Sequence, residues 1–278
     1  MKLGTSSRGR AERAVGAAIV MLVGFATTIV AAPHAFATPI TYVVDSTADT
    51  DGNCDATPLH CTLREAINST EGHAGHDTIT FSVTGTITVT ASTPLPQIRD
   101  AVTIDATNGS CAPTVELDGT SAGSFSRGLY IIGTDGTVIR GLAVNHFDWA
   151  GIDLSSTQHT HIECNYLGLA LDGTTDAGNT NNGIHLDSDS GDVIGGSAAT
   201  RNVLSGNDST GIRVTNASLN TIAGNYIGTN AAGTAKVPNN TGIFLSIGAT
   251  NNTIGTGNLL SGNDYAGVMM ESSATGNA

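Results

Sequence analysis

A four-residue pattern recurs through the second half of the chain, and it restricts the fold more than any other feature of the sequence. Each copy consists of Gly, an aliphatic residue, any residue and a second aliphatic residue. The copies lie 32, 28, 31 and 25 residues apart and begin at Gly151, Gly183, Gly211, Gly242 and Gly267. In the first four, an isoleucine follows the glycine by 11 or 12 positions, at Ile162, Ile194, Ile222 and Ile254. This spacing predicts an array of similar structural units.

The apolar stretches within each unit are short. They alternate with a period of two residues and are bounded by Gly, Asn, Asp, Ser and Thr, which is typical of β-strands between turns. Three such strands in roughly 28 residues fit an all-β fold, a parallel β-solenoid with coils stacked ~4.8 Å apart. A leucine-rich or propeller array is the alternative, but the consensus residues of those repeats are absent.

The solenoid predicts columns of like side chains in its interior. One column contains Ile152, Ile184, Ile212, Ile243 and Val268, and its neighbour contains Leu154, Leu186, Val214, Leu245 and Met270. A recurring asparagine is expected at the turns, where aligned copies form ladders along the stack; these copies are Asn165, Asn202, Asn225 and Asn258. Earlier, less regular coils are expected from apolar stretches at 79–81, 86–90, 102–105, 115–117 and 129–132.

The N-terminus has the features of a secretory signal peptide. Four basic residues precede an apolar run over 14–32, and Ala35-Phe36-Ala37 offers a cleavage site. An uncleaved anchor is the alternative, but Gly and Thr residues dilute the apolar run. We therefore expect a signal peptide over 1–37, a capping module over 38–76, and β-helix coils over 77–278 with no membrane span after cleavage.

The charge of the exported chain limits its partners. Removing residues 1–37 takes away four of the 11 basic and one of the 24 acidic residues, so the net charge falls from −13 to −16. Such a charge disfavours nucleic acid and anionic membranes as partners. We expect a secreted or cell-surface location.

Export also affects the four cysteines, because an oxidising compartment favours disulfides over metal-binding thiolates. Cys54 and Cys61 close a short loop and are the preferred pair. For Cys111 and Cys164 the sequence leaves both a disulfide and free thiols open.

A capping box at Thr62-Leu63-Arg64-Glu65 predicts a short helix that begins after Thr62 and runs through Asn68. Leu63, Ala66 and Ile67 give this helix one apolar face. A solenoid leaves its terminal coil open, so a disulfide-tethered helix before the first coil is expected to cover that end.

The segment Cys61-Thr62-Leu63-Arg64-Glu65-Ala66-Ile67 resembles the N-terminal module named for its Cys-Ser-Leu-Arg-Glu-Ala signature, with Thr62 in place of the usual Ser. Residues from about 115 onward resemble the right-handed parallel β-helix repeats that follow this module in exported bacterial proteins of the pectin-lyase-like fold. The resemblance implies an exported β-helix and carries no catalytic residues across. The fold itself hosts lyases, hydrolases and adhesins, so it does not define an activity.

One outer file of residues is the candidate functional site. In the first strand of each coil, Asp153, His185, Arg213 and Phe244 stand between buried neighbours and are expected to point outward in a row. We expect a scaffold that binds polysaccharide or host-surface glycans, in the manner of an adhesin. The alternative is a polysaccharide-active lyase or glycoside hydrolase that uses Asp153, His185, Asp187 and Arg213. A purely structural fragment is a third interpretation.

Two further groups are weaker candidates. Asp49, Asp51, Asn53 and Asp55 alternate in the manner of a calcium-binding loop but lack its later bidentate Glu, and a plain acidic loop is the alternative; no other cofactor is expected. Tyr166 and Tyr226 occupy equivalent positions and are candidates for stacking on sugar rings, although a repeat consensus explains them equally well.

The spacing also bears on the last coil. The isoleucine due 11 positions after Gly267 falls at Ala278, the final residue, so the last coil is expected to be incomplete. An incomplete coil exposes a strand edge, which predicts edge-to-edge self-association.

Overall fold

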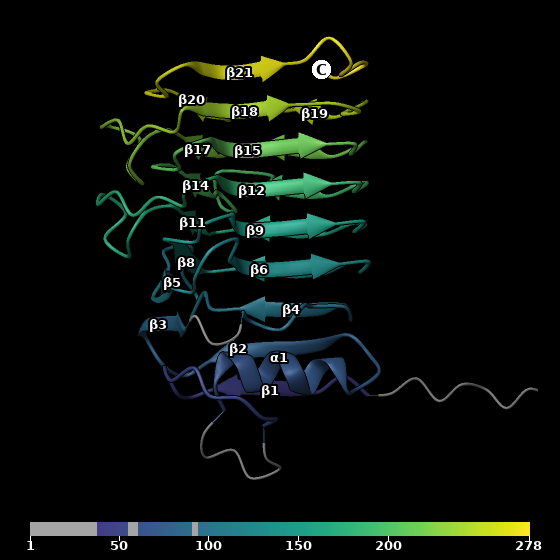
Figure 1. Cartoon of the computed structure of the whole chain (residues 1–278), viewed down its shortest axis with the longest axis vertical. Coiled ribbons are helices and arrows are strands. Elements are labelled where there is room, and N and C mark those ends of the chain that lie inside the picture. The colour runs from purple at the N-terminus through teal and green to yellow at the C-terminus, as the bar shows by residue number, and fades with distance from the viewer. Residues whose placement is uncertain (1–37, 55–60, 91–93) are drawn as a thin grey trace, which may run out of the picture. The chain divides into compact units, whose positions relative to one another are not determined.

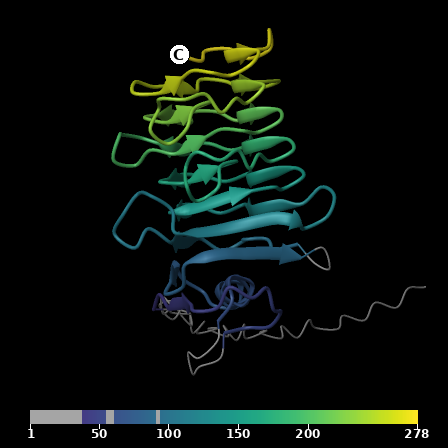
Figure 2. The ribbon, with the colours of Figure 1, turned by 90° about the vertical axis from the view of Figure 1, so that its left-hand side faces the viewer.

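The computed structural model describes residues 38–54, 61–90 and 94–278. From residue 102 onward the chain passes through three sheets in turn, A, B and C, and then returns to sheet A one level higher (Figure 1). The coils lie one above another when the stack is seen from the side (Figure 2). The expected signal peptide lies outside the described residues. In the part of the chain that is described, no helix is long and apolar enough to cross a membrane.

All three sheets are parallel, and their strands are short. Sheet A contains β1 (Thr41–Val44), β2 (Asp77–Phe81), β4 (Val102–Asp105), β7 (Val138–Arg140), β10 (His161–Glu163), β13 (Val193–Gly195), β16 (Thr221–Ala223) and β19 (Thr253–Ile254). Sheet B contains β3 (Gly85–Thr90), β5 (Val115–Ser121), β8 (Leu142–Asn145), β11 (Tyr166–Leu167), β14 (Val203–Leu204), β17 (Tyr226–Ile227) and β20 (Leu259–Leu260). Sheet C contains β6 (Arg127–Ile132), β9 (Ala150–Ser155), β12 (Asn182–Asp187), β15 (Thr210–Thr215), β18 (Thr241–Leu245) and β21 (Ala266–Met270).

The predicted columns of side chains are present. Ile162, Ile194, Ile222 and Ile254 pair in register along sheet A, and the column continues toward the N-terminus through Ile139, Ile104 and Ile79. Both predicted columns of sheet C also pair in register. Because nearly all of these side chains are buried, each coil stabilises the next through apolar contact as well as backbone hydrogen bonds.

The glycine at the second position of each sheet C strand that has another coil stacked on it is required by close approach between coils. A Cβ on Gly183 would lie 2.6 Å from the carbonyl oxygen of Gly211, and one on Gly151 would lie 2.9 Å from that of Gly183. Real Cβ atoms essentially never come so close to a carbonyl oxygen. The repeat therefore keeps Gly at this position to let successive backbones stack.

Buried asparagines form ladders at all three corners of the coil, and the ladder expected at Asn165, Asn202, Asn225 and Asn258 is confirmed. In it, each amide oxygen accepts from the backbone N–H of the asparagine one coil earlier, as in the 3.0 Å bond from Asn165 N to Asn202 Oδ1. The second ladder contains Asn179, Asn207, Asn239 and Asn263, and the third contains Asn220, Asn252 and Asn277. These bonds satisfy buried turn backbone that the strands leave unpaired.

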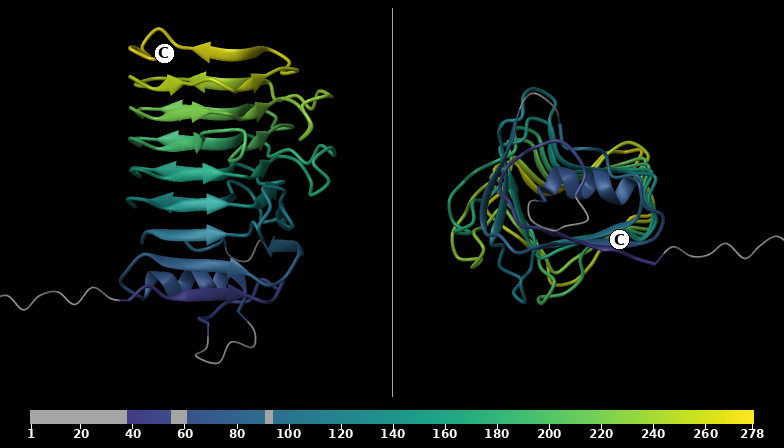
Figure 3. Two further views of the ribbon diagram at one scale, coloured as in Figure 1. Left: turned by 180° about the vertical axis from the view of Figure 1, so that it is seen from behind. Right: turned by 90° about the horizontal axis from the view of Figure 1, so that it is seen from below.

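Helix α1 (Leu63–Glu71) begins as predicted and ends three residues later than predicted. Both bonds of the capping box are present, and the apolar face is buried. The helix continues past Asn68 until the first glycine, Gly72, which caps it with a backbone N–H that donates to the carbonyl of Thr70. It packs against β1 and β2 and lies within the outline of the coils when seen along the stack (Figure 3).

Arg64 on α1 is 3% exposed, a burial that its sequence pattern did not indicate. Its Nε and Nη2 atoms lie 2.7 and 2.9 Å from the two carboxylate oxygens of Asp49, and Nη1 donates to the carbonyl of Pro94 at 2.6 Å. These bonds lower the pKa of Asp49 against the opposing effect of its burial.

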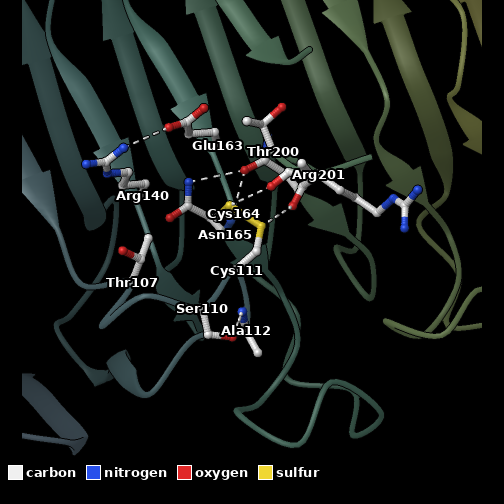
Figure 4. The surroundings of a disulfide bond; sticks show 12 residues. Thr107, Ser110, Cys111, Ala112, Arg140, Glu163, Cys164, Asn165, Thr200 and Arg201 are labelled. Atoms are coloured by element: carbon white, nitrogen blue, oxygen red, sulfur yellow. Dashed lines mark hydrogen bonds and ion pairs between the residues drawn. A yellow bond between two sulfur atoms is a disulfide. The ribbon is translucent and has the colours of Figure 1, made fainter. Parts of the chain in front are cut away.

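Two disulfides are present, Cys54–Cys61 and Cys111–Cys164. The first is the pair preferred from the sequence, and the second resolves the alternative that the sequence left open. Cys111 precedes β5, whereas Cys164 lies at the corner between β10 and β11, so the bond joins segments 53 residues apart (Figure 4). The Arg140–Glu163 ion pair lies beside it.

The sheet A column gives a direct test of the stacking. We expect Ile194→Ala to lower the free energy of unfolding by about 3 kcal/mol, since it removes buried methylenes and leaves a cavity between coils. The neighbouring outward residue is the control: Val193→Ala is expected to cost about 1 kcal/mol or less. Denaturant unfolding measures both, and equal losses would contradict the predicted column.

The Cys111–Cys164 disulfide gives a second test. It closes a loop of 53 residues, so a Cys111→Ser, Cys164→Ser double variant is expected to lose about 4 kcal/mol through the larger entropy of its unfolded chain. Denaturant unfolding under non-reducing conditions measures the loss against the parent protein, which keeps Cys54–Cys61. No change in the unfolding midpoint would argue against a stabilising role for this disulfide.

Candidate functional site

The outer face of sheet C carries the predicted file of residues. Register pairs join Asp153 to His185, His185 to Arg213, and Arg213 to Phe244. The file extends in the N-terminal direction to Tyr130 on β6 and in the C-terminal direction to Met269 on β21. The parallel sheet holds these side chains on neighbouring strands at a spacing of ~4.8 Å.

Asp153 is an outward residue that its neighbours nevertheless cover, and it is only 4% exposed. Its Oδ1 atom lies 2.9 Å from His185 Nδ1, and its Oδ2 atom forms an ion pair with Arg127 Nε. Asp153 therefore lies in the expected outer file, but Arg127 and His185 fold over its carboxylate and cover it. Asp153 can position these two residues but has little surface for contact with a ligand.

His185 is held on both sides. Its Nε2 atom lies 3.4 Å from the hydroxyl of Thr215, and its ring meets Trp149 edge to face with centroids 6.0 Å apart. An ionised Asp153 favours the tautomer with the proton on Nδ1, which leaves Nε2 as an acceptor. The arrangement is therefore an oriented histidine whose second nitrogen faces a hydroxyl.

Asp187 lies in the adjacent file, where its register partners are Ser155 and Thr215. The hydrogen bonds of His185 go to Asp153 and Thr215, and Asp187 accepts from Ser188. The acid–base pair in the described structure is thus Asp153 with His185, and Asp187 takes no part in it.

Aromatic and cationic side chains surround this pair. The Arg127 guanidinium lies 4.7 Å from the ring centroid of Tyr130 and 5.8 Å from that of Trp149. Arg213 lies 5.5 Å from the centroid of Phe244. Within the described ranges Arg213 has no carboxylate partner, and its Nε atom is buried without a hydrogen bond.

Three of these residues were missed from the sequence: Arg127, Tyr130 and Trp149. A signal for Tyr130 was available, because Gly128-Leu129-Tyr130-Ile131 repeats the four-residue pattern one coil before Gly151, whereas Arg127 precedes that pattern. Trp149 lies just before β9 and outside the four residues of the pattern, so the pattern did not predict where its side chain lies.

A hollow adjoins the N-terminal end of the file. It is lined by Pro94, Leu95, Gln97, Phe125, Arg127 and Tyr130. Phe125 is 73% exposed and has φ of 57°, a left-handed conformation that is unusual for a bulky residue. Its backbone N–H donates to Asp148 Oδ2 at 2.6 Å, which holds the exposed ring in place beside the hollow.

Tyr166 and Tyr226 lie on a different face, the outer side of sheet B. They pack with Leu169, Val203 and Val237 beneath the two chain segments that connect sheets B and C in these coils. Burial raises the pKa of Tyr166, and the Arg201 guanidinium lies 3.8 Å from the Tyr226 centroid. The structure therefore gives these rings packing contacts and does not bring them to the sheet C file.

Two acidic side chains of the predicted calcium-binding loop are hydrogen-bonded to other protein groups. Both oxygens of Asp49 are bonded to Arg64, and Asp51 Oδ1 accepts from the backbone of Gly52 and the amide of Asn68. Asn53 is exposed, and Asp55 lies outside the described residues. Asp49 is thus directed toward the helix.

The family model described as "Right handed beta helix region" matches residues 107–278. The chain therefore belongs to this family, and its fold is a right-handed parallel β-helix with a short N-terminal helix. No curated protein matches the chain.

A crystal structure of pectate lyase Pel9A is among the similar solved structures, with a TM-score of 0.45 and 14% sequence identity. The match covers 79% of this chain and 63% of that one. This chain therefore spans less than two thirds of the length of the pectate lyase chain.

The free energy of unfolding tests whether Asp153 stabilises the fold through its bonds to Arg127 and His185. We expect Asp153→Asn to lower the free energy of unfolding by about 2 kcal/mol, since it removes the charged partner of Arg127 and His185. Asp187→Asn is the control and is expected to change it by less than about 0.5 kcal/mol. Similar values for the two variants in denaturant unfolding would contradict the assigned role.

Proposed function

We propose that this protein is a secreted or cell-surface β-helix that binds polysaccharide along the outer face of sheet C. The observation that carries the proposal is the file Tyr130, Asp153, His185, Arg213 and Phe244, with Trp149 and Arg127 beside it. Aromatic faces stack on the apolar faces of sugar rings, while Arg and His bond to hydroxyls. Both kinds of group occur here on one ordered sheet.

The location is supported by two observations. Disulfides persist in oxidising compartments, and all four cysteines are paired. The apolar N-terminal run with its small-residue cleavage site supports export.

The charge of the chain bears on the class of glycan. A net charge of −16 after removal of residues 1–37 opposes a densely anionic polymer at long range. Arg213 nevertheless offers one guanidinium that no carboxylate neutralises within the described ranges. A neutral glycan, or one with isolated acidic groups, suits this combination best.

A second candidate function, turnover of the bound polysaccharide, rests on the His185 geometry. A histidine whose Nδ1 is fixed by a carboxylate can accept a proton at Nε2. In this state Nε2 faces Thr215, so a substrate hydroxyl or ring proton would have to displace that contact.

Binding is tested on a glycan array, followed by calorimetry with the glycans that bind. We expect Phe244→Ala and Arg213→Ala each to weaken binding about tenfold or more, because each removes stacking or a cationic donor. His161→Ala is the matched control, since His161 is exposed on the outer face of sheet A and should leave affinity unchanged. Equal loss in the control, or no glycan binding by the parent protein, would refute the proposal.

The same glycans decide between binding and turnover. Release of new reducing ends or unsaturated products, lost in His185→Gln, would establish the enzyme. Binding without product would establish the non-enzymatic scaffold.

A further inference from the structure

Three successive coils bury a cluster of oxygen-bearing side chains at the corner between sheets C and A. The register of the neighbouring residues aligns Thr134 with Thr157 and Asp189, and aligns Thr137 with Thr160 and Asp192. None of the six is more than 4% exposed. The six aligned buried positions of this corner therefore carry only hydroxyl and carboxylate side chains.

The hydrogen bonds of this cluster are incomplete. The Thr157 hydroxyl lies 3.1 Å from Asp189 Oδ1 and 3.0 Å from Asp192 Oδ2, but its single proton can serve only one of them at a time. Backbone N–H groups of Thr157 and Thr160 donate to the two Oδ1 atoms, each at 2.7 Å. Asp189 Oδ2 and the Thr160 hydroxyl are buried and make no hydrogen bond of acceptable geometry.

The cluster also lacks a positive partner. Within the described ranges no Lys, Arg or His forms an ion pair with either carboxylate. The nearest basic group acting on Asp192 is His159, which is exposed and bonds to Asp135 on the surface. Two adjacent buried carboxylates without a cation are costly to keep ionised.

The next two coils turn the same corner without this cluster. There Ala217 and Ala249 take the place of Asp189, while Asn220 and Asn252 take the place of Asp192 and continue the amide ladder. The turn itself therefore does not require carboxylates. The acidic pair has replaced residues that complete the hydrogen bonding at this corner.

We propose that Asp189 and Asp192, with the hydroxyls of Thr157 and Thr160, form a buried binding site for one calcium ion. Calcium prefers oxygen ligands, and here the Thr157 hydroxyl lies within 3.1 Å of an oxygen of each carboxylate. The cation would neutralise the pair and give the unpartnered Asp189 Oδ2 and Thr160 Oγ1 atoms a ligand. The site is separate from the acidic loop near Asp49, and it is independent of glycan binding.

A shared proton is the competing occupant. Burial raises the pKa of Asp189 to about 8, with a further increase from the Asp192 carboxylate. In the unfolded chain an aspartate titrates near its ordinary value of about 4. If only a proton occupied the pair, the contribution of Asp189 to stability would be fully present below pH about 4 and would be lost as the pH rises through about 8.

Thermal unfolding of the metal-stripped protein at neutral pH tests the site. Millimolar CaCl₂ is expected to raise the unfolding midpoint by about 5 °C or more relative to EGTA. Calorimetry is expected to show that the parent protein binds one calcium ion per chain. Asp189→Ala and Asp192→Asn are each expected to abolish this binding. Both variants place a residue that the next coils already accept at the same corner, so both are expected to fold.

Two controls locate the effect. Asp187→Asn changes an outward carboxylate of the same segment, and Asp51→Asn changes the N-terminal acidic loop; both are expected to keep the calcium-dependent shift. A shift that survives in Asp189→Ala and Asp192→Asn would overturn the proposal. Equal midpoints in CaCl₂ and EGTA would also overturn it. In that case a loss of stability from pH about 4 to 8 that Asp189→Ala abolishes would identify the proton as the occupant.

Discussion

Parallel hydrogen bonding between successive coils is the constraint on which the rest of this structure depends. Once one coil pairs with the next, residues one repeat apart must lie over one another, so each position inside the coil becomes a column. The columns of Ile, the ladders of Asn and the recurring Gly of sheet C all result from this in-register pairing of coils. A substitution is therefore accepted according to what lies directly above and below it.

The same constraint explains how far the sequence could predict the fold. The spacing of Ile162, Ile194, Ile222 and Ile254 was sufficient to place a column, because a constant interval and a buried aliphatic residue have one simple solution in a stack of coils. The helix start at Thr62 was also predictable, since the capping box is local. The helix end was placed three residues too early, at Asn68, although Gly72 is the first residue after the capping box that typically ends a helix.

The candidate site was predictable in position but not in detail. Period-two alternation indicated that Asp153 and His185 share an outer file, but it could not indicate that Arg127 from the coil before folds over the carboxylate. Long side chains reach across coils, so their partners depend on rotamers rather than on register. The same limit applies to Arg64, whose buried bonds to Asp49 join residues 15 positions apart within the N-terminal segment.

The Cys111–Cys164 bond has a further consequence for how the protein withstands proteases. It ties the start of sheet B in an early coil to a corner in a later one, and the turns that follow β6 and β9 lie between the two cysteines in the sequence. A single cut in one of those exposed turns would leave two pieces still covalently joined and still stacked. Damage there would separate the chain only after reduction, so a nicked molecule would keep its outer faces in one particle.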